Sequence, residues 1–132
     1  MLFRSTPAWL DVEQATFLPD ASLMVAGLIH GVTGSRILHI TEGQQPALLP
    51  LGEARYPAAS PDGRWLAFSR MQRGNWNLAL LDLHSGSVRG IADAECNTIE
   101  PAWEPDSKTI LYSSDCGRAL WFTAVSRRRI VP

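Results

Sequence analysis

The sequence predicts an all-β protein assembled from repeated four-stranded antiparallel meanders, and three observations lead to that prediction. Its apolar runs are four to six residues long, which suits strands and is too short for helices. Ten glycines and nine prolines are spread along the whole chain, as turns between many short strands require. The dipeptide Pro-Asp recurs 42 and then 44 residues apart, a period that fits one four-stranded blade of a propeller.

Each repeat is organised around its Pro-Asp pair. After each pair and two further residues, an apolar run begins, at Leu23, Trp65 and Thr109. A turn that contains glycine follows, and then a second apolar run, expected at 37–40, 78–83 and 120–125. Each repeat therefore contributes at least two adjacent central strands.

The middle repeat shows a complete meander. A first strand is expected at 56–60, and a tight turn at 84–86 leads into a fourth strand at 88–91. In the last repeat a turn is expected at 126–128, followed by a short fourth strand at 129–132. These assignments predict one unit over 1–132 with approximate repeats 14–55, 56–97 and 98–132.

The segment from Tyr56 to Ser69 resembles the Pro-Asp subclass of WD40-like repeats that builds the propeller of the TolB-like family. The stretch from Pro101 to Asp115 is similar, but it has Glu104 and Ser107 where the family pattern favours Ser and Gly. The first repeat matches less well. The resemblance implies a β-propeller with Pro-Asp in the turn between the first two strands of each blade, and it favours a periplasmic or extracytoplasmic location.

The Pro-Asp segments have a simple physical role. Proline presets φ for an early turn position, aspartate accepts from backbone N–H groups two residues on, and glycine supplies a positive φ where one is needed. We therefore interpret these residues as structural turn formers and not as catalytic groups or metal ligands. They are Pro19, Asp20, Pro61, Asp62, Gly63, Pro105 and Asp106.

The number of repeats is itself informative. Closed propellers have about four to eight blades, whereas this chain has about three, so we expect a partial or half propeller. Its two terminal blades would leave apolar faces that need a cover. The cover could be the remaining blades of a larger protein of which this is the C-terminal part, another protein partner, or a second copy that closes a six-bladed ring.

Cys96 and Cys116 are the two cysteines of the chain. In the repeat register they fall in loops at the same end of a blade, so a disulfide could form and would contribute about 3 kcal/mol. The alternative is two ordinary thiols. A bridge would favour an oxidising compartment, and a metal site is disfavoured because there is no second cysteine pair and no nearby histidine.

The sequence shows no constellation for catalysis or cofactor binding. His30, His39 and His84 have no ligand spacing, and neither a Gly-x-Ser-x-Gly elbow nor a phosphate-binding glycine loop occurs. Twelve basic and thirteen acidic residues give a net charge of -1, which disfavours nucleic acid as a partner. The apolar runs are too short to span a membrane. We therefore expect no enzyme activity, no cofactor and no metal.

One surface is a candidate for binding a ligand or partner. Trp76 follows the turn at Gly74, and arginines occur in and around similar turns. An exposed indole with cationic neighbours can form a contact patch, although stacked Trp and Arg side chains also serve packing. The residues of this predicted patch are Arg70, Arg73, Trp76 and Arg118.

The function that follows is a non-catalytic propeller module that binds a protein or another ligand. One alternative is the regulatory or gating propeller of a serine peptidase of the prolyl oligopeptidase type, without its hydrolase domain. Another alternative is the sensory domain of a larger regulator. Because fold alone does not determine function, these alternatives stay open at the level of sequence.

Overall fold

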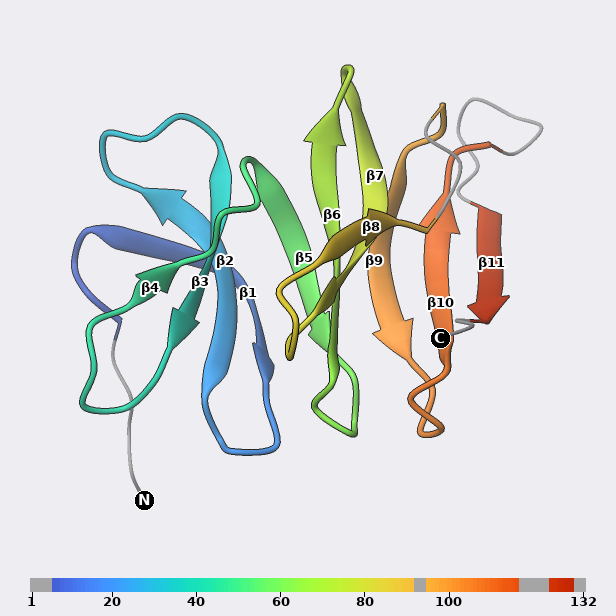
Figure 1. Cartoon of the computed structure of the whole chain (residues 1–132). Coiled ribbons are helices and arrows are strands. Elements are labelled where there is room, and N and C mark those ends of the chain that lie inside the picture. The colour runs from blue at the N-terminus through green and yellow to red at the C-terminus, as the bar shows by residue number, and fades with distance from the viewer. Residues whose placement is uncertain (1–5, 92–94, 117–123, 130–132) are drawn as a thin grey trace.

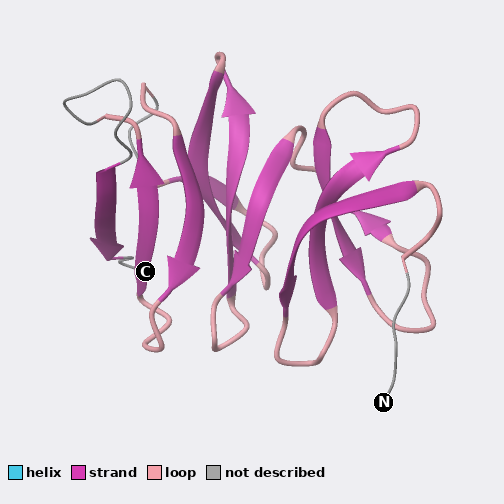
Figure 2. Ribbon diagram, turned by 180° about the vertical axis from the view of Figure 1, so that it is seen from behind, coloured by secondary structure: helices cyan, strands magenta, loops and turns pink. Residues whose placement is uncertain are grey.

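The computed structural model describes residues 6–91, 95–116 and 124–129, and within them it contains strands and turns but no helix. The strands form three antiparallel sheets that stand side by side as blades (Figures 1 and 2). The predicted fold class, an all-β partial propeller of about three blades, is confirmed. None of the described residues lies in a helix able to cross a membrane.

Each blade pairs its strands in chain order. Blade 1 consists of β1 (Leu10–Phe17), β2 (Leu23–Ile29), β3 (Ser35–Ile40) and β4 (Ala47–Leu48). Blade 2 consists of β5 (Ala54–Ala59), β6 (Trp65–Gln72), β7 (Asn75–Asp82) and β8 (Val88–Gly90). Blade 3 consists of β9 (Thr98–Trp103), β10 (Thr109–Ser114) and β11 (Ala124–Arg129). Blade 1 thus begins at Leu10, ahead of the residue 14 expected from the repeat.

The first strand of each blade packs against the blade before it. Strand β5 contacts β1, β2 and β3, and β9 contacts β5, β6 and β7 in the same way. Figure 1 shows this arrangement, with β5 on the side of blade 2 nearest blade 1 and β9 on the side of blade 3 nearest blade 2. The repeat in the sequence is therefore also a repeat of blade-to-blade contacts.

The turn expected at 126–128 in the last repeat is wrong, because these residues lie inside β11. Ser126 is paired with Tyr112, and Arg127 with Leu111, in an unbroken antiparallel register. The ladder with β10 gives the backbone groups of this segment hydrogen-bond partners, which outweighs the weak strand signal of three consecutive arginines. Residues 120–123 and 130–132, where the other ends of the expected strands fall, lie outside the described residues.

The Pro-Asp turn of blade 1 is one residue shorter than the other two. The backbone N–H before the proline donates to the carbonyl of Trp65 in blade 2 and of Thr109 in blade 3, both five residues on. In blade 1 Leu18 donates to Ser22, four residues on. Because side chains alternate between the two faces of a strand, this one-residue difference reverses which residues of β2 face the next blade.

The interface between blades 1 and 2 holds the largest buried cluster. Met24, Ala26 and Ile37 of blade 1 pack there with apolar side chains of blade 2, among which Leu66 and Phe68 are fully buried. Each of the larger side chains contributes about 1.5–3 kcal/mol by leaving water. A second cluster joins blades 2 and 3. Its members are Ala67, Leu78, Leu80, Ile91 and Ile110.

A third cluster lies on the face of blade 1 that is turned away from blade 2. Val25 and Leu38 alternate along their strands with residues that face blade 2, so they point to the opposite side, where Leu10 packs with them. All three are less than 5% exposed, shielded in part by half-buried neighbours such as Leu23 and Ile40. The centre of this terminal face is thus partly covered already, in contrast to the exposed face expected from the sequence.

Candidate functional site

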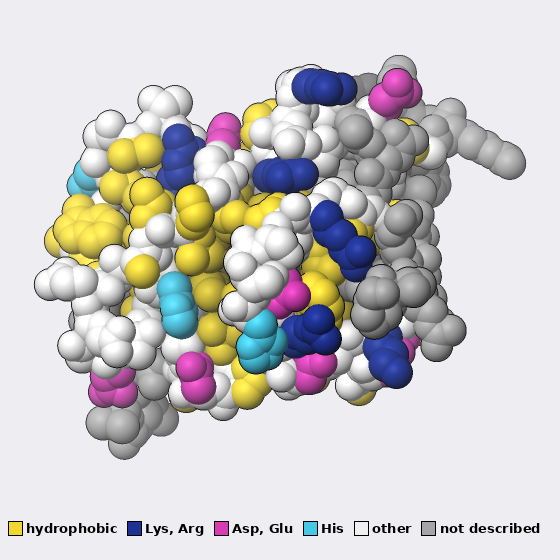
Figure 3. Space-filling view, viewed as in Figure 1, with side chains coloured by type: hydrophobic (Ala, Val, Ile, Leu, Met, Phe, Trp, Pro, Cys, Tyr) yellow, Lys and Arg dark blue, Asp and Glu magenta, His cyan; other side chains and the backbone are white. Residues whose placement is uncertain are grey.

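A hollow of about 610 Å³ opens between blades 1 and 2. Figure 3 shows apolar side chains gathered along this junction, with histidine and carboxylate side chains beside them. We call it the inter-blade groove. Its apolar lining includes Leu18, Met24, Leu49, Leu51, Leu81 and Val88, and its ionisable lining consists of Asp20, His39, Asp62, Asp82 and His84.

The floor of the groove is continuous with the core between the blades. Met24 on β2 and Leu81 on β7 are 3% and 7% exposed, and both belong to the large cluster. Leu49 and Leu51 lie in the connection from β4 to β5, which is fixed by a hydrogen bond from Leu49 N–H to the carbonyl of Ile37 at 3.0 Å. The floor is therefore an apolar surface that both blades form, and its residues are held by core packing and by this hydrogen bond.

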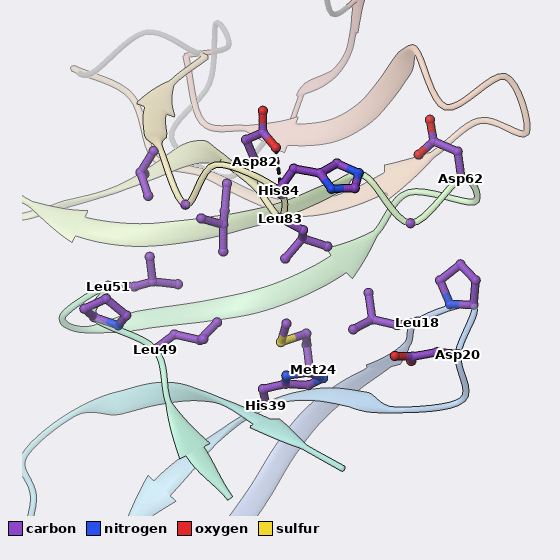
Figure 4. A pocket seen from close by; sticks show the side chains of 16 residues that line it. Leu18, Asp20, Met24, His39, Leu49, Leu51, Asp62, Asp82, Leu83 and His84 are labelled. Carbon is purple, nitrogen blue, oxygen red and sulfur yellow. Dashed lines mark hydrogen bonds between the residues drawn. The ribbon is translucent and has the colours of Figure 1, made fainter.

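The two ends of the groove differ in chemistry. Figure 4 shows Leu49 and Leu51 at one end, and Leu18 with the carboxylates of Asp20 and Asp62 at the other. The two aspartates come from equivalent Pro-Asp turns of neighbouring blades. These turns touch, because a Cβ placed on Gly63 would be 3.0 Å from Cγ of Pro19.

The Pro-Asp carboxylates accept hydrogen bonds from their own turns. Oδ1 of Asp20 accepts from the N–H of Ser22 at 2.9 Å and from its hydroxyl at 2.5 Å. Oδ1 of Asp62 accepts from the hydroxyl of Ser60 at 2.6 Å and from the N–H of Arg64 at 3.0 Å. The serine hydroxyl is the larger influence in each case, and it lowers the pKa of Asp20 and of Asp62 below the ordinary value. Both groups are therefore charged at neutral pH.

Asp82 is the third carboxylate of the rim. Its Oδ1 accepts from the backbone N–H of His84 at 2.9 Å, and this bond is the main reason that its pKa is lowered. Its other oxygen, Oδ2, lies 3.7 Å from Nη2 of Arg64, whose guanidinium stacks over the ring of Trp65. Asp82 is thus already partly neutralised by a neighbouring cation.

A serine, a histidine and an aspartate meet at the rim, but their hydrogen bonds run in the wrong direction for nucleophilic catalysis. Nε2 of His39 lies 2.8 Å from Oγ of Ser22, and the single hydroxyl proton of Ser22 is donated to Asp20. Nε2 of His39 must then donate to the hydroxyl instead of accepting its proton, as a general base would. Ser22 is also only 3% exposed. The trio therefore holds the rim in place.

The structure places the other histidines apart from this trio. His84 lies in the turn between β7 and β8 and lines the groove. His30 lies elsewhere, exposed, with its Nε2 3.4 Å from Oδ2 of Asp11. Sequence spacing alone could not have brought His39 and His84 to one groove, because they come from different blades.

The predicted patch of arginines around Trp76 is only partly assembled. The indole of Trp76 is half-buried at the start of β7, and the guanidinium of Arg55 lies 5.0 Å from its ring centroid. Arg73 is exposed in the turn between β6 and β7, and Arg70 lies on β6. Arg118 is outside the described residues. No pattern in the sequence pointed to Arg55, which reaches Trp76 from β5, a strand of the same blade that β6 separates from β7.

Cys96 and Cys116 are joined as a disulfide in the structure, with their Cα atoms 5.4 Å apart. The bridge ties the segment before β9 to the segment after β10. Next to it, both carboxylate oxygens of Asp115 accept from Asn97, at 2.7 Å from the backbone N–H and 2.6 Å from Nδ2. Asp115 and the two sulfurs form the one cluster of potential metal ligands among the described residues, and the bridge occupies both sulfurs.

Comparisons with known proteins identify the fold. No family model matches the chain, and no curated protein matches it in sequence. TolB from Acinetobacter baumannii matches in structure with a TM-score of 0.75 and 19% identity, over 91% of this chain and 30% of that protein. A putative TolB from Agrobacterium tumefaciens matches with a TM-score of 0.74 and 19% identity, over 86% of this chain and 40% of that protein.

The propeller domain of the trilobed protease from Pyrococcus furiosus also matches, with a TM-score of 0.64 and 16% identity, over 83% of this chain and 35% of that one. At these identities the likeness establishes a shared fold, that of a TolB-like partial propeller. The chain spans less than half the length of each of these three structures.

Proposed function

We propose that this chain is a non-catalytic propeller module that binds a partner or ligand in the inter-blade groove. The observation that carries the proposal is the groove itself, a hollow of about 610 Å³ with an apolar floor and a charged rim. Its volume lies within the range of about 300–1,000 Å³ that is common for ligand sites. The direction of the hydrogen bonds among Ser22, His39 and Asp20 supports binding over hydrolysis.

We also propose that the module belongs to a larger TolB-like propeller protein of the periplasm or another extracytoplasmic compartment. The likeness to two TolB structures, each longer than this chain, supports this assignment. Further blades would pack on the face of blade 1 that carries Leu10, Val25 and Leu38. A second copy of the chain could cover the same face and close a six-bladed ring.

The second candidate function is the gating propeller of a serine peptidase. The match to the propeller of the trilobed protease favours it. This candidate predicts a hydrolase domain in the same gene, which sequencing the flanking region would reveal. Under this second candidate function, the groove would be a contact site for the hydrolase domain.

The experiment for the first proposal is a ligand-observed NMR screen with neutral aromatic fragments. Leu51→Lys places a charge in the groove, and Leu48→Lys is its matched control, because Leu48 is 56% exposed on β4 and does not line the groove. We expect fragments to bind the native protein and Leu48→Lys, with at least tenfold weaker binding to Leu51→Lys.

Circular dichroism would verify that both variants fold. Fragments that bind all three proteins equally would contradict the proposal. So would turnover of a p-nitrophenyl ester faster than by the Ser22→Ala variant, because that result would require an active hydroxyl.

A further inference from the structure

We infer that the inter-blade groove takes an extended peptide segment that presents an apolar side chain and, close to it, a lysine or arginine. This inference rests on the proposed function and adds the chemistry of the partner. It follows from the charge of the lining, from the carboxylate oxygens at one end that accept no hydrogen bond from the described residues, and from the apolar character of the other end.

All permanent charges in the lining of the groove are negative. It includes three aspartates and neither lysine nor arginine. Arg64 is a cation beside this rim, but its guanidinium pairs with Asp82 and stacks over the ring of Trp65, and its charge is shared with Asp62. One arginine faces three carboxylates, so a cationic group of a ligand would complement the remaining negative charge.

Asp20 and Asp62 have the capacity to hold that cation. Each uses only Oδ1 for the hydrogen bonds of its own turn. No donor in the described part of the chain bonds to Oδ2 of either residue. Figure 4 places both carboxylates at the same end of the groove. Their lowered pKa values keep both charged in the neutral range, so an ammonium or guanidinium there gains charge-assisted hydrogen bonds.

The opposite end of the groove suits an apolar side chain. Leu49 and Leu51 stand there above a floor that includes Met24 and Leu81. A group buried against them contributes about 25 cal/mol for each Å² of apolar surface removed from water. The ligand must therefore present two different groups some distance apart.

A peptide supplies such a pair of groups in neighbouring side chains. The groove lies open along the junction of two blades and is not an enclosed cavity, as Figure 3 shows. An extended segment can lie along it with one side chain at the leucines and the next basic side chain at the aspartates. The site therefore fits a flexible segment of a partner protein that carries an apolar side chain and a basic side chain close to each other.

The test uses acetylated and amidated peptides with a neutral fluorescent dye. They are Leu-Leu-Ala-X and X-Ala-Leu-Leu, in which X is lysine, glutamine or glutamate, so that both chain directions are sampled. Fluorescence anisotropy at low salt should show tightest binding for lysine and weakest for glutamate in at least one direction, with at least a fivefold preference for lysine over glutamine.

The variant Asp20→Asn/Asp62→Asn should lose this preference and bind the lysine peptide as it binds the glutamine peptide. The control Asp11→Asn/Asp106→Asn has the same net charge and leaves the groove intact, so it should keep the preference. Retention of the full preference in Asp20→Asn/Asp62→Asn would overturn the inference.

Failure of the inference and failure of the proposed function give different results. Equal binding of all three peptides, abolished by Leu51→Lys, would overturn the charge selection and leave the groove as a binding site. If no peptide binds at concentrations up to millimolar while neutral fragments still bind, the peptide inference is overturned and the groove remains a binding site. Peptide and fragment binding that Leu51→Lys leaves unchanged would contradict both.

Discussion

The two junctions between blades arise from the same repeat but differ in how they are filled. Phe17, Ala59 and Trp103 occupy equivalent positions, because each stands two residues before the proline of its Pro-Asp pair. At the junction of blades 2 and 3, Trp103 packs against the cluster, and its indole N–H donates to the carbonyl of Ala58 at 2.8 Å. At the junction of blades 1 and 2 the small Ala59 stands in its place.

The shorter turn of blade 1 enlarges this difference. It places Ser22 where blade 2 has Trp65, and it places His39 where blade 2 has Leu80. Large apolar groups in one junction therefore correspond to small or polar groups in the other. A single repeat can therefore produce either a filled contact or a groove, depending on a few residues and on the length of one turn.

The largest expected effect is from Trp103→Ala. Loss of the ring and of its hydrogen bond to Ala58 should lower the free energy of unfolding by about 4 kcal/mol, as measured by urea denaturation. The matched control is Phe17→Ala at the equivalent position of blade 1, where the ring is 68% exposed. This change should stay within about 0.5 kcal/mol. Equal losses from the two variants would contradict the difference between the junctions.

The next effect is that of the disulfide, which ties the segment before β9 to the segment after β10 in blade 3. Replacing both cysteines, as Cys96→Ser/Cys116→Ser, should lower the free energy of unfolding by about 3 kcal/mol, because the closed loop no longer restricts the unfolded chain. Urea denaturation measures the loss. Titration of two reactive thiols in the native, non-reduced protein would show that the bridge does not form.

A smaller effect tests the contact between the two Pro-Asp turns at the groove. Gly63→Ala introduces a side chain at φ of 76° and brings its Cβ to 3.0 Å from the ring of Pro19. Gly86→Ala is the control, with a φ of 79° and no atom within 4 Å. Both should lose about 1 kcal/mol to backbone strain, and Gly63→Ala about 1 kcal/mol more. Equal losses would mean that the turns do not touch.

The smallest effect is the pH dependence that comes from Asp62. Hydrogen bonds from Ser60 and Arg64 lower its pKa in the folded protein, so its stabilising contribution is present above the unfolded value of 3.8 and is lost as the pH falls through the folded pKa. Asp62→Asn should therefore flatten the decline of stability below about pH 4, measured by urea denaturation at a series of pH values. An identical decline in the variant would contradict this assignment.

The sequence was sufficient to predict the meanders and the positions of the Pro-Asp turns, because these depend on local signals. Pro-Asp at a regular spacing, with short apolar runs after it, predicts four-stranded meanders without reference to distant contacts. The position of β11 was not predictable in the same way. Its three consecutive arginines carry a weak strand signal, so the local pattern alone favours a turn. Only their pairing with β10 holds them in a strand.

The groove depends on features that no single repeat contains. Met24 and Leu81 belong to different blades, and their meeting requires the correct face of β2. That face is decided by a turn of blade 1 that is one residue shorter, a detail visible in the bond from Leu18 to Ser22. Within blade 2, Arg55 on β5 reaches Trp76 on β7 across the intervening strand β6. Contacts between strands that are not adjacent, whether in one blade or in two, were thus beyond reasoning from local patterns.

The most direct test of binding in the inter-blade groove is a map of chemical-shift changes in the ¹H–¹⁵N spectrum of the native chain during titration with the lysine-bearing peptide. We expect the largest changes on both blades around the groove, at Asp20, Leu51, Asp62 and Val88, while the tightly packed Ile110 at the other junction stays unchanged. Changes centred instead on Trp76 and Arg73 would contradict it, because they would place binding at the turn of blade 2 and not between the blades.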